Sequence, residues 1–334
     1  MQDMLLTAII PIVLCLLALY GVKQDDKAFF SKNCTNALKG LASVVVVLVH
    51  VREAHGNPLQ DAIGSFAFVG VTFFFLVSSY GMHFAIDKNP NYLSTFWRNR
   101  LISLLIPVFF VNICQFGIHY FTQNELCYGK LWSINRYVLV LLQYCILFYF
   151  VELYGRRRSD WVLDYVIVSV VVVSSLCLYL YAENAYWSFE RIGLVWGILL
   201  YRFFGSIRRY FESKRFKKVF LWGIGSLILG VLYLKFKSVP FFGEYLLKIS
   251  LGFVILVFFF VLTSKYNIGN NRFAQFLGDI SFEVYLSHDF VMALVDKFTN
   301  LPSGQFILLS LALTILLSSA IRFFSSKLVR ILRS

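Results

Sequence analysis

Charged residues are scarce in this chain of 334 residues. Asp, Glu, Lys and Arg together make up 15% of it, against about 25% in soluble domains. Hydrophobic residues reach 59% and aromatic residues 18%, and the mean hydropathy is +0.71. Long polar segments are missing as well, because the longest polar connections, 205–217 and 264–279, are too short to fold alone. This composition excludes a soluble globular protein and predicts one all-α, polytopic membrane domain.

Acidic residues are outnumbered by basic ones, 18 to 31, which gives a formal net charge of +13. A nucleic-acid-binding protein would gather such an excess on one accessible face. Here the basic residues are distributed between apolar stretches, so we expect no nucleic-acid partner. Their distribution indicates orientation in a bilayer and contact with membrane lipids.

Eleven apolar stretches are long enough to cross a membrane. They predict about 11 transmembrane helices. The first stretch lacks a positive charge before it and a small-x-small cleavage site after it, so we expect a retained helix rather than a signal peptide. The stretches are 4–22, 37–54, 64–86, 101–122, 133–153, 160–182, 186–204, 218–236, 244–263, 280–297 and 303–325.

Topology follows from the placement of the basic residues. If every second connection, starting with 23–39, lies on one side, that side holds 23 of the 31 basic residues and the other holds eight. The positive-inside rule assigns the richer side to the cytoplasm. We therefore expect a multi-pass protein of the plasma or inner membrane, with its N-terminus outside and its C-terminus in the cytoplasm.

Lys39 and His50 lie in the second stretch, eleven residues apart. Eleven steps of 100° make three turns plus 20°, so both polar groups fall on one helix face, about 16 Å apart along its axis. A histidine inside a membrane is costly unless it faces protein or water. The spacing makes the pair a candidate site.

Three sequence blocks occur in a defined order. Lys39-Gly40 leads to His50 and is followed by Phe73-Phe74-Phe75-Leu76-Val77-Ser78-Ser79-Tyr80-Gly81. The segment 96–107 holds Arg98 and Arg100 and ends in Pro107. The segment 280–288 reads Ile-Ser-Phe-Glu-Val-Tyr-Leu-Ser-His. Together the three blocks resemble the acyltransferase 3 family of membrane acyltransferases.

The resemblance implies transfer of an acyl group, most often acetyl from cytoplasmic acetyl-CoA, to a hydroxyl of an extracytoplasmic carbohydrate. It implies a ten-helix core at 37–325, preceded by an extra helix and cytoplasmic loop at 1–36 and followed by a basic cytoplasmic tail at 326–334. Acetyl-CoA would be a donor substrate, with no permanently bound cofactor. The acceptor would be a surface or exported polysaccharide, or its lipid-linked precursor.

By the family pattern, His50 is the catalytic histidine, Lys39 is its basic partner, and Arg100 is the first arginine of an Arg-x-x-Arg segment. Two positions depart from the pattern. The second arginine is replaced by Ser103, and the glycine of a Ser-Gly-Tyr-Gly turn by Ser79. Arg98 could supply the missing charge.

Acyl transfer from a thioester needs an activated hydroxyl and a hold on the phosphates of the donor. A neutral imidazole at His50 can accept the hydroxyl proton and pass it to the leaving thiolate; an acyl-histidine intermediate is the second variant. Arg98 and Arg100 are expected to bind CoA phosphates. The simpler alternatives are a packed histidine, an interfacial lysine at Lys39 and positive-inside charge at the arginines.

Ser281, Tyr285 and His288 recur at i, i+4 and i+7, which aligns them on one helix face. They are predicted to bind the acceptor, with a structural hydrogen-bond ladder as the alternative. Glu190 is a further candidate for the acceptor hydroxyls, or else part of a structural pair with Arg191. The histidines show no metal-binding spacing, so no metal is expected.

Two functions from other classes stay open. A transporter or flippase for a glycan or lipid precursor would also have many helices with polar residues inside the membrane. An inert membrane sensor that keeps the fold is the other, raised by Ser79 and Ser103.

Overall fold

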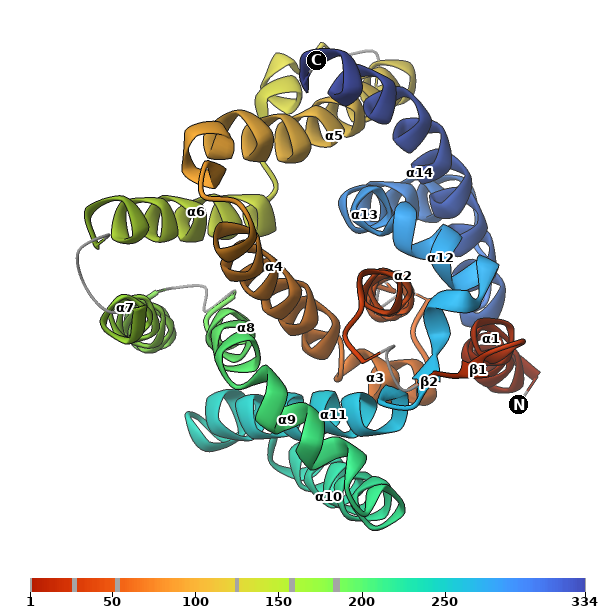
Figure 1. Ribbon diagram of the computed structural model, residues 1–334. Coiled ribbons are helices and arrows are strands. Elements are labelled where there is room, and N and C mark those ends of the chain that lie inside the picture. The colour runs from red at the N-terminus through yellow and green to blue at the C-terminus, as the bar shows by residue number, and fades with distance from the viewer. Residues whose placement is uncertain are drawn as a thin grey trace.

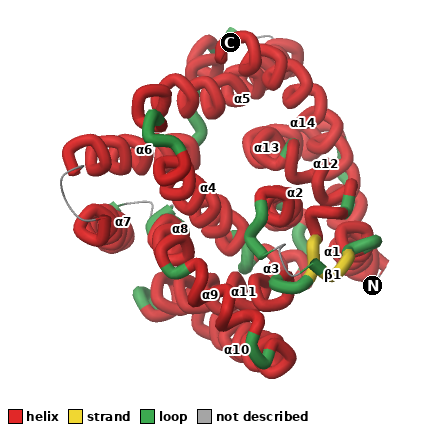
Figure 2. Tube along the Cα trace, viewed as in Figure 1, coloured by secondary structure: helices red, strands yellow, loops and turns green. Residues whose placement is uncertain are grey.

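The computed structural model of the protein describes residues 2–25, 29–51, 55–123, 126–155, 160–182 and 187–333. Nearly all of these residues are helical (Figure 2). The strands described form a two-stranded antiparallel sheet, in which β1 (Lys23–Gln24) pairs with β2 (Tyr266–Asn267). This pairing joins the connection after the first helix to the connection before the late helices.

The longer helices lie at the predicted stretches. They are α1 (Gln2–Leu19), α2 (Lys32–Val49), α4 (Phe68–Lys88), α5 (Tyr92–Gln123), α6 (Arg136–Gly155), α7 (Asp160–Tyr181), α8 (Ile192–Arg202), α10 (Arg215–Phe236), α11 (Lys248–Thr263), α13 (Ser281–Phe298) and α14 (Ser303–Arg333). The connections contain short helices: α3 (Pro58–Gly64), η2 (Tyr128–Trp132), α9 (Phe204–Glu212), η3 (Phe242–Leu247), η4 (Ile268–Asn270) and α12 (Arg272–Asp279).

Among the described residues, nine helical segments are long and apolar enough to cross a membrane. Together with the helical content, they confirm an all-α polytopic membrane protein. Two of the eleven predicted segments are helical but differ from ordinary spans. Helix α8 has 11 residues, about 16 Å and so roughly half of a bilayer core. Helix α13 has 18 residues but carries two aspartates, a glutamate and a lysine.

Several boundaries differ from those predicted. Helix α2 begins and ends five residues before the predicted stretch 37–54. Helix α5 already begins at Tyr92, so the basic segment and Pro107 lie inside one helix. Helix α14 continues to Arg333, so the described part of the predicted tail is helical. Hydropathy alone places the apolar centre of a helix, whereas caps and charged end turns set its ends.

Helices α2 and α13 lie in the interior of the assembly (Figure 1). Helix α14 covers one side of them together with α1, and α4 lies on the other side, toward α8 and α11 (Figure 1). The largest buried cluster joins α4, α5 and α6 to Tyr285 and Leu286 of α13. A second cluster packs α2 and α13 against α14 and Ile10 of α1. The polar residues of α2 and α13 are therefore held by packing on both sides.

Candidate functional site

His50 ends helix α2. It is the C-cap residue, and its backbone N–H still donates to the carbonyl of Val47. Its Nδ1 lies 2.8 Å from the carbonyl oxygen of Val46, and Gln60 Nε2 donates to the carbonyl of Leu48. Side chains thus satisfy carbonyls that the end of a helix leaves open. The predicted position of His50 within a continuing helix is wrong: the helix stops there.

His288 lies in the first half of α13 and is 5% exposed. Its Nδ1 lies 2.8 Å from the carbonyl oxygen of Tyr285. Its Nε2 is buried and has no hydrogen-bond partner among the described residues. A buried polar atom without a partner costs free energy, so this nitrogen is available for a ligand.

The two histidines meet edge to face. Their ring centroids are 4.7 Å apart and the ring planes are inclined by 68°. A carbonyl oxygen only accepts hydrogen bonds, so Nδ1 carries the proton in each neutral ring, and each Nε2 is an acceptor. Two neighbouring acceptor nitrogens form hydrogen bonds only with donors, such as the hydroxyl groups of a bound molecule.

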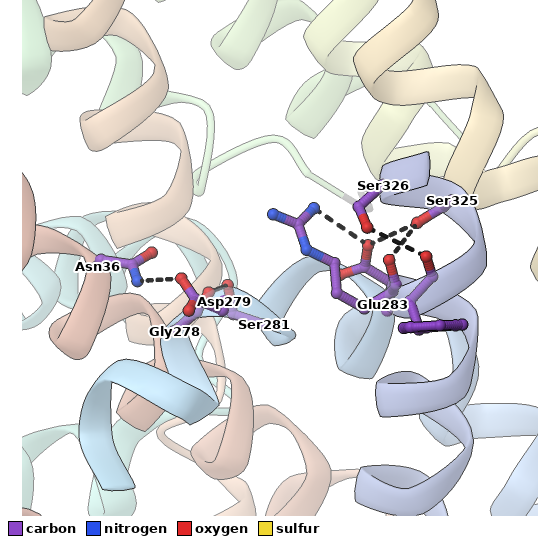
Figure 3. Close-up of polar contacts among 9 residues, drawn as sticks. Asn36, Gly278, Asp279, Ser281, Glu283, Ser325 and Ser326 are labelled. Atoms are coloured by element: carbon purple, nitrogen blue, oxygen red, sulfur yellow. Dashed lines mark hydrogen bonds and ion pairs between the residues drawn. The ribbon is translucent and has the colours of Figure 1, made fainter. Parts of the chain in front are cut away.

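Tyr285 and Ser281, the other members of the predicted face, are buried as well. The Tyr285 ring packs against Tyr137 at 4.9 Å between centroids, and against Phe74 at 5.9 Å. Ser281 Oγ donates to the carbonyl of Gly278 at 2.8 Å, so its hydroxyl is used at the start of α13 (Figure 3). The structure therefore places Tyr285 beside His288, with 5.8 Å between the ring centroids. Ser281 lies one helix turn before Tyr285, and its hydroxyl is bound to the Gly278 carbonyl.

Lys39 belongs to a group of charges at the start of α13. Its charged neighbours include Asp279, Glu283 and Arg322. Glu283 is fully buried, and its Oε1 lies 3.5 Å from Arg322 Nη1 and 3.5 Å from Ser325 Oγ. Figure 3 shows the Glu283 carboxylate directed toward Ser325 on α14. Lys39 thus faces the same α12–α13 segment that His50 meets further along.

A close helix crossing fixes α2 against this segment. A Cβ atom at Gly40 would lie 2.4 Å from the backbone nitrogen of Gly278. Beside it, Asn36 Nδ2 donates to Asp279 Oδ1 at 2.8 Å (Figure 3). Gly40 contacts Gly278, and His50 contacts His288. Ten residues separate the two contacts on each of the two segments. The two segments therefore run parallel and in register.

The arginines proposed for phosphates lie on α5. Arg98 is exposed. Arg100 is half-buried: its Nη2 donates to the Tyr92 hydroxyl at 3.0 Å, and its guanidinium lies 5.7 Å from the centroid of the Phe96 ring. Ser103, at the position of the missing arginine, donates its hydroxyl to carbonyls of the preceding turn. Among the described residues, no hydrogen bond or ion pair joins these arginines to Lys39 or to the histidines, but α14 packs along α5, and Arg333 Nη2 donates to the Asn99 carbonyl at 3.0 Å.

The second departure from the family pattern has a structural explanation. Ser79 is fully buried, and its Oγ lies 2.6 Å from the hydroxyl of Tyr144. The serine that replaces glycine thus binds α4 to α6. This contact belongs to a larger buried network in which Asp164 of α7 pairs with Arg202 of α8 and lies 3.4 Å from His83 Nε2. Sequence reasoning missed this network, because its members are far apart in the chain.

Glu190 lies in the turn before α8, not inside a span. It is 8% exposed, and its Oε2 has no hydrogen-bond partner among the described residues. Its charged neighbours are Lys248 and Arg191, and it also lies within electrostatic range of Tyr285. Arg191 is bound separately, through Nε to the Trp187 carbonyl at 2.8 Å and through Nη1 to Ser174 Oγ at 3.1 Å. Glu190 is therefore a buried carboxylate within electrostatic range of Tyr285.

Glu283 and Arg322 are two charged residues near the site that sequence reasoning did not nominate. Glu283 lies inside the block 280–288, and its position between Ser281 and Tyr285 was the available signal. Arg322 gave none beyond its place near the cytoplasmic end of a long apolar stretch. Only the packing of α13 against α14 brings the two together.

Comparison with known proteins adds one finding. The family model described as an acyltransferase domain (Acyl_transf_3) matches residues 33–323, which is most of the chain. No curated protein and no solved structure matches it.

Proposed function

Because the chain belongs to the acyltransferase 3 family, whose matching domain is an acyltransferase domain, we propose that it transfers an acetyl group from cytoplasmic acetyl-CoA to a hydroxyl of a cell-surface or exported polysaccharide, or of its lipid-linked precursor. His50 acts as the general base. The observation that carries this proposal is the His50–His288 pair, with both Nδ1 atoms on backbone carbonyls and a buried, unpartnered Nε2 on His288.

The chemistry follows from the two acceptor nitrogens. Nε2 of His50 takes the proton of the acceptor hydroxyl while the hydroxyl oxygen bonds to the thioester carbon. The tetrahedral intermediate then collapses with cleavage of the carbon–sulfur bond, and the proton passes from His50 to the leaving thiolate. Nε2 of His288 accepts a hydrogen bond from a second hydroxyl of the acceptor. Neighbouring hydroxyls on one sugar ring satisfy both nitrogens.

In this proposal the acyl donor, acetyl-CoA, lies on the side of the histidines opposite to the acceptor. Arg100 and Arg98 bind phosphates of CoA at the cytoplasmic end of α5, where guanidinium groups pair well with phosphate oxygens. Lys39 adds positive charge between that end and His50. This arrangement requires α2 and α13 to run from a donor site on the cytoplasmic side of the membrane to an acceptor site on its outer side. The C-terminus then lies in the cytoplasm.

Tyr285 and Glu190 complete the acceptor side. The phenol lies beside His288, and the carboxylate of Glu190 is buried with one oxygen unpartnered among the described residues. A carboxylate accepts hydrogen bonds from hydroxyl groups. Glu190 therefore orients further hydroxyls of the sugar.

The test uses purified protein in lipid nanodiscs, radiolabelled acetyl-CoA and an envelope glycan extract. We expect label in the glycan with intact protein and loss of at least about 100-fold in rate with His50→Gln, the range that a positioned base contributes. His83→Gln serves as the matched control, because His83 is a buried histidine outside the site. Thermal unfolding of each variant verifies folding.

Three outcomes contradict the proposal. If the His50→Gln variant transfers acetyl at the normal rate, His50 is not the general base. An equal loss in a folded His83→Gln variant makes the effect non-specific. Binding of acetyl-CoA without transfer to any glycan of an extract that a related enzyme acetylates favours the inert sensor.

A further inference from the structure

An apolar cavity of about 350 Å³ lies between helices α8, α9, α10 and α11. Figure 1 shows α9, α10 and α11 at the edge of the assembly, away from α13 and α14. The wall of the cavity is built mainly of aliphatic and aromatic side chains, among them Trp196, Leu199 and Phe253. It includes none of the residues of the proposed catalytic site. The cavity is therefore a separate feature, which the proposed function does not use.

Trp222 adds a hydrogen-bond donor to this wall. Its indole Nε1 is buried and has no hydrogen-bond partner among the described residues. The ring is held by packing, with its centroid 6.3 Å from that of the Phe253 ring. An indole nitrogen only donates, and a buried donor without an acceptor costs free energy. A ligand that satisfies Trp222 must therefore carry an acceptor oxygen into otherwise apolar surroundings.

Positive charge adjoins the wall of the cavity at α9. Ser206 and Tyr210 of this helix belong to the wall. The ammonium group of Lys218 lies 3.7 Å from the centroid of the Tyr210 ring. Arg209 Nη2 donates to Ser206 Oγ at 3.5 Å. Two cations are thus in contact with lining side chains.

Residues 205–218 carry an excess of basic side chains. Their acidic residue, Glu212, is paired with Arg208 at 2.7 Å. The remaining basic residues are Arg209, Lys214, Arg215, Lys217 and Lys218. Three of these donate hydrogen bonds to carbonyl or hydroxyl oxygens, and the other two are exposed. Neutral oxygens do not cancel a positive charge, so this end of the cavity attracts an anion.

The donor of Trp222 lies deeper along α10 than the charges. Arg215, the first residue of α10, donates to the carbonyl of Val261 near the end of α11 at 3.0 Å. Trp222 follows Arg215 by seven residues, about 10 Å along the helix axis, and meets Phe253 earlier in α11. Lys218 and Trp222 are four residues apart, so they share one face of α10. The cavity therefore runs from a basic end to an isolated donor with apolar walls.

We propose that this cavity binds a phospholipid with a negatively charged headgroup from the cytoplasmic leaflet. The headgroup phosphate pairs with Lys218 and Arg209, an ester carbonyl accepts the hydrogen bond of Trp222, and one acyl chain lies against the aromatic wall. A volume at the lower end of small-molecule sites suits the ester and the upper part of a single chain. The connection 205–217 is predicted to be cytoplasmic, and that leaflet carries anionic lipids.

The first measurement is lipid binding by native mass spectrometry of the full chain in detergent micelles. The protein is titrated with phosphatidylglycerol and with phosphatidylcholine of identical acyl chains, so that the two probes differ only in the headgroup. We expect the first phosphatidylglycerol to bind about ten-fold more tightly, the size of one charge-assisted hydrogen bond. Glycerol phosphate, which has no chains, should not displace it at equal concentration. The assay contains no acetyl-CoA, so its result is independent of the proposed transfer.

Variants assign the parts of the lipid to the parts of the cavity. The double variant Arg209→Gln/Lys218→Gln should bind both lipids equally. Trp222→Phe keeps an aromatic ring but loses the N–H, so it should weaken both lipids several-fold and keep the preference. Leu199→Trp fills the cavity from a partly exposed position and should also weaken both. Lys235→Gln is the matched control, because Lys235 is an exposed lysine at the other end of α10.

Each result supports or overturns the site. Equal affinity of the intact protein for the two lipids, or an unchanged preference in the double variant, refutes the headgroup assignment. Full affinity in both Trp222→Phe and Leu199→Trp places the lipid on the outer surface of the basic connection and refutes the cavity. Displacement by glycerol phosphate makes the ligand a free phosphate group rather than a lipid. Thermal unfolding verifies folding, and Trp222→Phe decides the test if Leu199→Trp does not fold.

Discussion

Substitution of Gly40 by alanine tests whether the α2–α12 crossing positions the His50–His288 pair. The added Cβ would lie 2.4 Å from Gly278 N, 2.6 Å from Leu277 C and 2.7 Å from Leu277 Cβ. Two of these three neighbours are backbone atoms, which cannot rotate away. To reach ordinary contact at 3.4 Å, the two helices must separate by about 1 Å. Overpacking of this kind costs about 1–3 kcal/mol of stability.

The effect on activity should exceed the effect on folding. His50 and His288 follow the crossing by the same ten residues on the two segments, so a separation there changes their 4.7 Å spacing. Misplacement of a reacting group by about 1 Å can reduce the rate about 100-fold. We therefore expect Gly40→Ala to fold with a lowered melting temperature and to lose about 100-fold in kcat, with KM for acetyl-CoA nearly unchanged.

The assay compares Gly40→Ala with Gly117→Ala in nanodiscs, by acetyl transfer and by thermal unfolding. Gly117 lies inside α5, and a Cβ there meets nothing within 4 Å. Its replacement should leave activity intact and stabilise the helix by up to about 1 kcal/mol. If Gly40→Ala keeps both the melting temperature and the kcat of the intact protein, the crossing does not set the spacing of the histidines, and the reasoning fails.

Three further predictions concern other parts of the site. His288→Phe should lower the melting temperature only by the loss of the Nδ1 hydrogen bond to the Tyr285 carbonyl, because Nε2 has no partner to lose among the described residues, yet it should lower kcat about 100-fold; full activity would show that His288 is not part of the site. Arg100→Gln should raise KM for acetyl-CoA about ten-fold and Arg98→Gln less, since only Arg100 is half-buried and oriented by Tyr92; equal KM values in steady-state kinetics would contradict this. Asp164→Asn should cost about 3 kcal/mol, because Arg202 loses its buried carboxylate; an unchanged thermal unfolding curve would show that the pair is not structural.

Much of the fold could be predicted from the sequence, because hydropathy reports directly on helices inside a bilayer. Each of the eleven predicted stretches contains a helix. The end of α2 could not be predicted, since the apolar run continues through Val51. It is set by contacts from outside the helix, above all Gln60 on the carbonyl of Leu48. The short length of α8 could not be predicted either, because the apolar residues before Ile192 belong to a turn.

The site was predictable in part. The spacing of Tyr285 and His288 indicated a shared face, and both are buried beside each other. Glu283 was missed because a single acidic residue near a helix start is ordinary in sequence. Its burial against α14 depends on packing between residues 42 positions apart. Such contacts have no local signal in one sequence.

The spacing between Lys39 and His50 has a physical reason in this structure. Helix α2 runs parallel to the α12–α13 segment and touches it closely at Gly40. From that fixed point, each residue adds 100° of rotation and about 1.5 Å of rise. One residue more or less before His50 would turn the imidazole away from His288, and the two rings would no longer lie edge to face. The interval is therefore a condition for the two histidines to meet, and Lys39, one residue before the crossing, is held at the start of that interval.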